Sequence, residues 1–189
     1  MAKQFEGIDD TLAEWIRAQH VFFVASAPLS GAGLVNLSPK GLTSLAIQSP
    51  REIAYLDFVG SGAETIAHAR ENGRITVMLC AFEGPPRIVR LQGRAMVVEP
   101  GDAEFAALVT KFPPREGVRA VIRVALTRVA DSCGYGVPLM RYEGDRKQLD
   151  AWAERKGAAG LREYQLANNR VSLDGLPALE AKTLRTDPA

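Results

Sequence analysis

The sequence is poor in the residues that build metal sites and disulfide frameworks. Its 189 residues include two histidines, His20 and His68, and two cysteines, Cys80 and Cys133, which lie far apart. Zinc sites need clusters of His and Cys, and small disulfide-stapled folds need several cysteine pairs. We therefore expect neither a metal site nor a disulfide framework.

Long apolar runs and an excess of charge of one sign are also missing. No run approaches the roughly 20 apolar residues that span a bilayer. The first ten residues, MAKQFEGIDD, lack the charged-then-apolar layout of a secretory signal. Lys and Arg number 23 against 22 Asp and Glu, which argues against a polybasic surface for nucleic acid. These features predict a cytosolic protein with no membrane or nucleic-acid partner.

The length of the chain and its 47% hydrophobic content predict one globular domain over residues 1–189. Within it we expect a core at about 10–143 and a helical C-terminal extension at about 144–179. The polar residues 180–189 are expected to form a frayed tail.

Strand patterns dominate the chain. Apolar and β-branched runs bounded by Gly, Pro and Ser predict strands at 21–27, 34–38, 42–47, 52–58, 74–82, 87–99 and 118–130. Apolar stripes at helical spacing predict short helices at 9–19, 63–71, 102–112, 146–157 and 161–169. Six or seven strands with a few short helices indicate a mainly β (α+β) protein built as a small closed antiparallel barrel.

One predicted strand, residues 74–82, is apolar almost throughout, with the sequence RITVMLCAF. A strand with one face in water alternates apolar and polar residues, whereas a strand covered on both faces does not. The run therefore predicts a barrel wall that is packed on its outer side by a helix or by a partner chain.

Small residues mark the turn after the predicted strand 52–58, in the sequence VGSGAETIAHA. Gly60, Ser61 and Gly62 allow close backbone approach, and the hydroxyls of Ser61 and Thr65 stand beside a helix N-terminus that carries partial positive charge. Such a turn suits a phosphate group. The motif lacks the GK[ST] ending and the GxGxxG spacing of nucleotide loops, so a plain turn with Ser61 as the helix cap is the alternative.

Polar residues alternate along a second segment, where Asn36, Ser38 and Lys40 share one face of an extended chain. An amide, a hydroxyl and an ammonium group on one face would turn toward the same ligand. The alternative is an edge strand that faces solvent and ends in a Pro-Lys-Gly turn.

Residues 52–99 resemble the central block of the pyridoxamine 5'-phosphate oxidase-like, FMN-binding split-barrel family. The positions that carry the resemblance are Tyr55, Ser61, Asn72, Gly73, Arg74, Arg87, Gly93 and Arg94. The stretch VNLSPKG, residues 35–41, is similar to the first flavin-contacting strand of the family. Together with SCGYGVP, residues 132–138, it resembles the predicted flavin-nucleotide-binding branch rather than the vitamin-making enzyme.

This resemblance implies a six-stranded antiparallel split β-barrel that forms a homodimer, with FMN in a groove between the subunits. It implies an FMN-dependent oxidoreductase that acts on a small molecule. The cofactor-binding residues that it implies, together with those argued above, are Asn36, Ser38, Lys40, Tyr55, Asp57, Ser61, Gly62, Thr65 and Arg87.

Four residues each have two possible interpretations. They are Asp57 and Arg87 among the cofactor-binding candidates, and Cys133 and Tyr135 as possible catalytic residues. Asp57 either accepts a hydrogen bond from the flavin or only closes the strand as a turn residue. Cys133 and Tyr135 lie in a loop between glycines. This loop either covers the flavin ring, with Tyr135 stacking on it or supplying a proton, or Tyr135 only packs, and Cys133 is either reactive or an inert buried thiol. Arg87 has the support of the family position, whereas most arginines on strands are surface charge.

The sequence departs from the family pattern where the FMN phosphate is usually held. Gly62 and Ala63 stand where many members have Arg and Lys, and Glu64 follows. Lys40, with Arg87 or Arg94, would then have to supply the positive charge. Ile88 replaces a Gln that often bonds the flavin ring. These departures keep two further ligands open, a deazaflavin and haem, the second with His20 or His68 as its ligand in a haem-storing, sensing or haem-degrading protein.

Overall fold

The computed structural model describes residues 3–180, which form eight strands and four helices. The strands are β1 (Lys3–Phe5), β2 (Phe22–Ser26), β3 (Asn36–Lys40), β4 (Leu45–Ser49), β5 (Glu52–Phe58), β6 (Arg74–Cys80), β7 (Ile88–Val98) and β8 (Val118–Ser132). The helices are α1 (Asp10–Arg17), α2 (Glu64–Glu71), α3 (Phe105–Val109) and α4 (Gln148–Asn168). The expected tail lies almost wholly outside the described residues.

All eight strands join one antiparallel sheet in the order β3-β2-β6-β7-β8-β5-β4, and β1 pairs with the far end of β8. The mainly β class with short helices is confirmed. The described part of the chain has eight strands rather than six, since the three-residue β1 is too short to give an alternating pattern. The strand predicted at 34–38 begins two residues later, because Leu34 and Val35 remain in an exposed loop.

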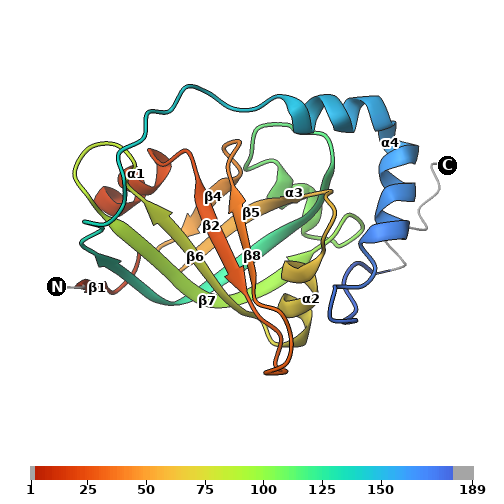
Figure 1. Cartoon of the computed structure of the whole chain (residues 1–189), viewed down its shortest axis with the longest axis horizontal. Helices are drawn as coiled ribbons and strands as arrows, with labels where there is room; N and C mark the ends of the chain where they lie inside the picture. Colours follow the sequence, from red (N-terminus) through yellow and green to blue (C-terminus); the bar gives the residue numbers. More distant parts are fainter. Residues whose placement is uncertain (1–2, 181–189) are drawn as a thin grey trace.

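The sheet curls until its two ends approach each other, which makes the barrel (Figure 1). Residues 41–44 connect β3 directly to β4, the two terminal strands of the order. Across the interior, the rings of Phe22 on β2 and Tyr55 on β5 meet edge to face with centroids 5.7 Å apart. The buried core therefore lies inside the curled sheet.

A β-bulge at Gln92 and Gly93 shifts the register between β7 and β8 by one residue. The inward-facing residues of β8 therefore change from even positions, such as Leu126, to odd positions, beginning with Val129. At the bulge the backbones lie so close that a Cβ atom on Gly93 would collide with the carbonyl of Ala125. Only glycine fits there without a shift of β8.

The outer face of β6 is only half covered by this chain. Ile75, Val77 and Leu79 point into the core, whereas Thr76 and Met78 on the other face are partly exposed. The apolar run predicted that both faces of β6 are packed, and the described residues do not supply this packing on the outer face.

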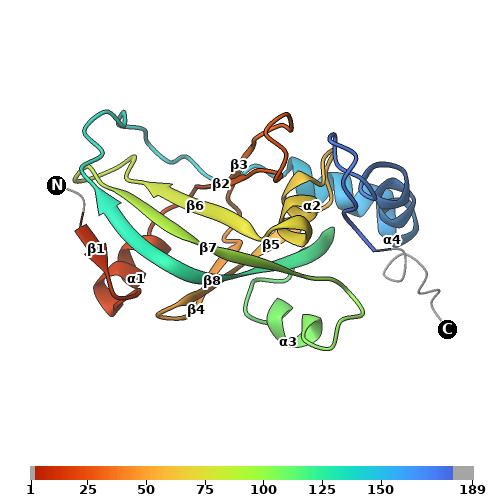
Figure 2. The ribbon, with the colours of Figure 1, turned by 90° about the horizontal axis from the view of Figure 1, so that it is seen from below.

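The helices close the ends and one side of the barrel. Figures 1 and 2 place α1 and β1 at one end of the sheet and α2 with α4 at the other. Helix α4 is interrupted at Gly157, whose φ of 62° and ψ of 173° are not helical, so the two expected helical pieces lie on either side of this kink. None of the helices in residues 3–180 is both long enough and apolar enough to cross a membrane.

Candidate functional site

The polar residues of β3 share the inner face of the barrel, as their alternation predicts. Asn36, Ser38 and Lys40 are half-buried, whereas Leu37 and Pro39 between them are exposed on the outer face. Lys40 at one end of this polar strip and Asn36 at the other belong to two separate clusters.

The first cluster is a buried ion triad at the end of β3. Asp57 on β5 is 1% exposed and accepts from Lys40 Nζ at 3.0 Å and from Arg119 Nε at 2.8 Å. Burial by itself raises the pKa of Asp57, but the two cations outweigh burial and hold that pKa below its ordinary value. Two positive charges thus share one carboxylate, which leaves the triad with a net charge of about +1.

Two buried donors, one beside this triad and one within it, have no hydrogen-bond partner among the described residues. They are the Tyr55 hydroxyl and Nη1 of Arg119. Burial, with the Asp57 carboxylate nearby, raises the pKa of Tyr55 well above its ordinary value, so the hydroxyl keeps its proton. Because buried donors are almost always paired, these two atoms fit a ligand or water that accepts hydrogen bonds here.

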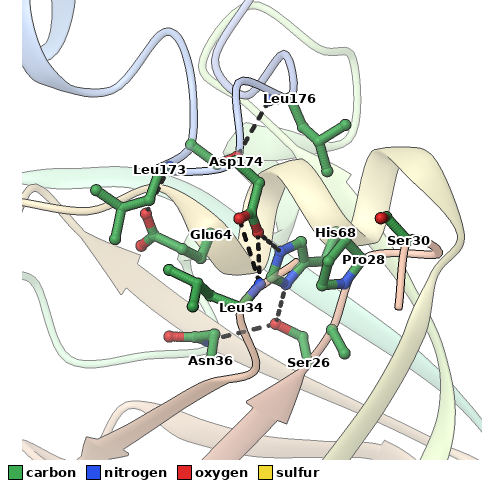
Figure 3. Close-up of polar contacts among 12 residues, drawn as sticks. Ser26, Pro28, Ser30, Leu34, Asn36, Glu64, His68, Leu173, Asp174 and Leu176 are labelled. Atoms are coloured by element: carbon green, nitrogen blue, oxygen red, sulfur yellow. Dashed lines mark hydrogen bonds and ion pairs between the residues drawn. The ribbon is translucent and has the colours of Figure 1, made fainter. Parts of the chain in front are cut away.

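The second cluster joins β3 to β2 and α2 (Figure 3). Asn36 Nδ2 donates to Thr65 Oγ1 at 2.9 Å and to Ser26 Oγ at 3.3 Å, and the Ser38 hydroxyl donates to Asn36 Oδ1 at 3.1 Å. Ser26 Oγ lies 2.9 Å from His68 Nδ1. Asn36, Ser38 and Thr65, three of the predicted residues, therefore form one network and already satisfy one another.

His68 is fully buried in this network, whereas the sequence suggested it only as a possible haem ligand and not as part of a flavin site. Its Nε2 has no hydrogen bond among the described residues and lies 3.9 Å from Asp174 Oδ2. Asp174 accepts instead from the amide of Leu34, at 3.0 Å. Four consecutive residues of α2, Thr65 to His68, are buried, so no helical period marks His68 from the sequence.

The turn that was expected to hold a phosphate is already filled by a carboxylate. Helix α2 begins after Ala63, which makes no side-chain cap, so the alternative with Ser61 as the helix cap is wrong. Ser61 is exposed. The Glu64 side chain folds back over Gly62, where an added Cβ atom would collide with its Oε2. The β3 end of the site therefore fits a ligand that accepts hydrogen bonds, whereas the turn as it stands does not fit a phosphate.

Arg87 lies in the connection between β6 and β7, apart from the other predicted cofactor residues. Its Nε and Nη2 both donate to Asp131 on β8, at 3.1 and 2.9 Å, and its guanidinium lies over the Trp15 ring. Cys133 and Tyr135 are exposed in the loop after β8, and Tyr135 retains 82% of its accessible surface, so the alternative of a buried Cys133 and a packed Tyr135 is wrong. The structure thus brings neither the arginine nor these two residues to the polar strip.

A large hollow lies beside α1. It has a volume of about 930 Å³ and is walled mainly by apolar side chains of α1, β2, the β6–β7 connection and residues 140–142. His20 is on its wall and stacks on Tyr142, with ring centroids 3.6 Å apart. None of the predicted cofactor residues except Arg87 lines this hollow.

Comparison with known proteins gives a consistent result. The sequence model of a family described as pyridoxamine 5'-phosphate oxidase matches residues 8–133. A curated Aspergillus flavus protein, "Pyridoxamine 5'-phosphate oxidase family protein ustO", is 43% identical over 194 residues, which cover 94% of this chain and 78% of that protein. Among solved structures, a single-residue variant of HupZ from Group A Streptococcus is similar at a TM-score of 0.51 and 20% identity, over 66% of this chain and 99% of that one. A FAD binding protein from Mycobacterium smegmatis matches at a TM-score of 0.47 and 13% identity, over 68% and 97% of the two chains.

Proposed function

The chain belongs to the pyridoxamine 5'-phosphate oxidase family, and from this premise we propose that it binds FMN and is an oxidoreductase that acts on a small molecule. The observation that carries the proposal is the polar inner strip of β3, which ends at a buried cluster with more positive than negative charge. A flavin supplies the electron transfer, and the protein supplies position, charge and exclusion of water.

The ion triad is the part of the site that would act on the flavin electrostatically. Lys40 is the member with the most accessible side chain, at 18%, and Asp57 holds its ammonium against the barrel wall. Arg119 fixes the other oxygen of Asp57, so Asp57 and Arg119 are positioning residues for Lys40. A fixed cation there favours anionic ligands and the negative charge that a flavin gains on reduction.

Titration of flavin fluorescence tests this placement. We expect Lys40→Ala to weaken FMN binding by about 1–3 kcal/mol, as for a charge-assisted hydrogen bond. The exposed Lys147, just before α4, offers Lys147→Ala as a matched control that should leave binding unchanged. Equal FMN affinities for the wild type and Lys40→Ala would remove Lys40 from the site.

We also propose a homodimer, in which a second copy covers the outer face of β2, β3 and β6. That face presents Phe23, Ala25, Leu37 and Met78 side by side, and Leu37 is 63% exposed. Exposed contiguous apolar surface of this kind marks an interaction site. The partner would also supply the second cover of β6 and the other half of the flavin groove.

Light scattering on a sizing column tests the dimer. The wild type is expected at twice the 20.4 kDa mass of the chain, and Leu37→Asp at the mass of one chain. Leu166→Asp, at a half-exposed position of α4, is the control that should stay dimeric. A wild-type protein that runs as a monomer at micromolar concentration would contradict the proposal.

One observation favours haem as a second candidate ligand. His20 is the exposed histidine and lies on the wall of the apolar hollow of about 930 Å³, whereas His68 is fully buried. An accessible imidazole in an apolar hollow suits a haem iron. An absorbance spectrum from 300 to 700 nm separates the candidates, since flavin bands support the first proposal and a Soret band lost in His20→Ala supports the second. The choice between FMN and a deazaflavin, and the cytosolic location, remain predictions.

A further inference from the structure

The N-terminal end of α2 carries its own negative group, Glu64. The Glu64 side chain turns back over Gly62, two residues before the helix begins. A carboxylate at a helix N-terminus is stabilised by the partial positive charge of the free amide groups there. Those amides are the same groups that would hold a phosphate. The carboxylate and a phosphate would therefore compete for one position.

Residues 169–180, which we call the C-terminal segment, keep Glu64 in this position (Figure 3). The amide of Leu173 donates to Glu64 Oε1 at 3.3 Å. Asn169 Nδ2 donates to the carbonyl of Gly60 at 2.8 Å, which fixes the segment to the turn. The segment lies beyond residue 133, where the family match ends.

A second carboxylate of the same segment stands close to α2. Asp174 bonds the amide of Leu34 and lies 3.9 Å from Nε2 of His68, a fully buried atom without a hydrogen bond among the described residues. No ion pair between Glu64 or Asp174 and a Lys or Arg is present among the described residues. Two carboxylates therefore lie beside α2 without a Lys or Arg counter-charge among the described residues.

We propose that Glu64 is an intramolecular competitor for the flavin phosphate, and that the C-terminal segment holds it in place. FMN then binds only when Glu64 and Leu173 separate, whereas a flavin without a phosphate binds with both in place. This inference rests on the proposed function, since it concerns the phosphate end of the same flavin site. Glu64 thereby sets the preference of the protein between phosphorylated and unphosphorylated flavins.

Affinities for FMN and riboflavin, measured by fluorescence titration on the full chain, test the proposal. Glu64→Gln keeps the shape of the side chain but removes its charge. We expect it to tighten FMN binding at least about tenfold and to change riboflavin binding less than about twofold, because a carboxylate and a phosphate a few ångströms apart repel strongly. Glu163→Gln, at an exposed position of α4, is the matched control and should change neither affinity.

Hydrogen exchange of the wild type gives a readout that needs no variant. Exchange of the Leu173 amide is expected to speed up when FMN is added and to stay unchanged with riboflavin, because only the phosphate displaces its acceptor. An unchanged ratio of FMN to riboflavin affinity in Glu64→Gln, or equal Leu173 exchange with both flavins, would overturn the proposal while leaving flavin binding intact. Failure of both flavins to bind any variant would overturn the proposed function and this inference with it.

Discussion

Replacement of Asp57 by Asn tests whether the ion triad holds the ends of the barrel together. Asp57 is 1% exposed and bonds Lys40 from β3 and Arg119 from β8, so it links three strands. Asn keeps the size of the side chain and removes its charge. Arg119, only 6% exposed, then remains buried without a counter-charge, and its Nη1 already lacks a partner.

The expected loss of stability in Asp57→Asn follows from the burial of Arg119. Removal of one partner from a buried ion pair costs about 3–5 kcal/mol, because the remaining charge stays desolvated. Exposed pairs contribute about 0–1 kcal/mol. Arg141 and Glu143 form such an exposed pair, so Glu143→Gln is the matched control and should be close to neutral.

Urea unfolding followed by circular dichroism measures both variants, at one fixed protein concentration because association would shift the transition. The stability lost in Asp57→Asn should also depend on pH. Since the pKa of Asp57 is lowered in the folded state, its contribution is complete above the ordinary carboxyl pKa of about 3.9 and is lost as the pH falls through the lower folded value. The stabilities of the wild type and Asp57→Asn should therefore converge below about pH 4. A loss under about 1 kcal/mol at pH 7 would refute the reasoning.

Two further predictions concern packing and exposure. Gly93→Ala should destabilise the protein by about 1–3 kcal/mol, since its Cβ would meet the Ala125 carbonyl, whereas Gly136→Ala has open space around it and should be near neutral in the same urea assay. A thiol reagent should label the exposed Cys133 in the native protein but not Cys80, which is buried and whose pKa is raised by that burial. Rapid labelling of both cysteines before unfolding would contradict the described core.

Apolar and β-branched runs were sufficient to predict most of the sheet. Strands β2, β5 and β6 lie where such runs are nearly continuous, and β7 and β8 lie where the apolar residues repeat with a period of two because one face lies in the barrel core. The period shifts at Gly93, where the glycine within the strand indicated a bend or a close contact and the structure has a bulge against β8. The period fails for β1, which is held by pairing with β8 alone.

The site was predictable only where a strand set the direction of the side chains. The inward face of Asn36, Ser38 and Lys40 followed from the alternation along β3. The bond of Leu173 to Glu64 and that of Leu34 to Asp174 use loop amides, which every residue except proline carries. Contacts of this kind depend on where distant loops meet in space, and no pattern in the sequence records them.

The place of β8 in the sheet constrains how the protein emerges from the ribosome. This strand, residues 118–132, pairs with β1, β5 and β7, which end at residues 5, 58 and 98. Before β8 is synthesised, β2, β3, β6 and β7 can pair among themselves, but the β4–β5 hairpin has no neighbour on its inner side. The nascent chain therefore carries two separate parts of the sheet, with open strand edges, until residue 132 has been made. During that interval the edges of both β5 and β7 are open to pairing with other chains, which is the situation that chaperones protect against.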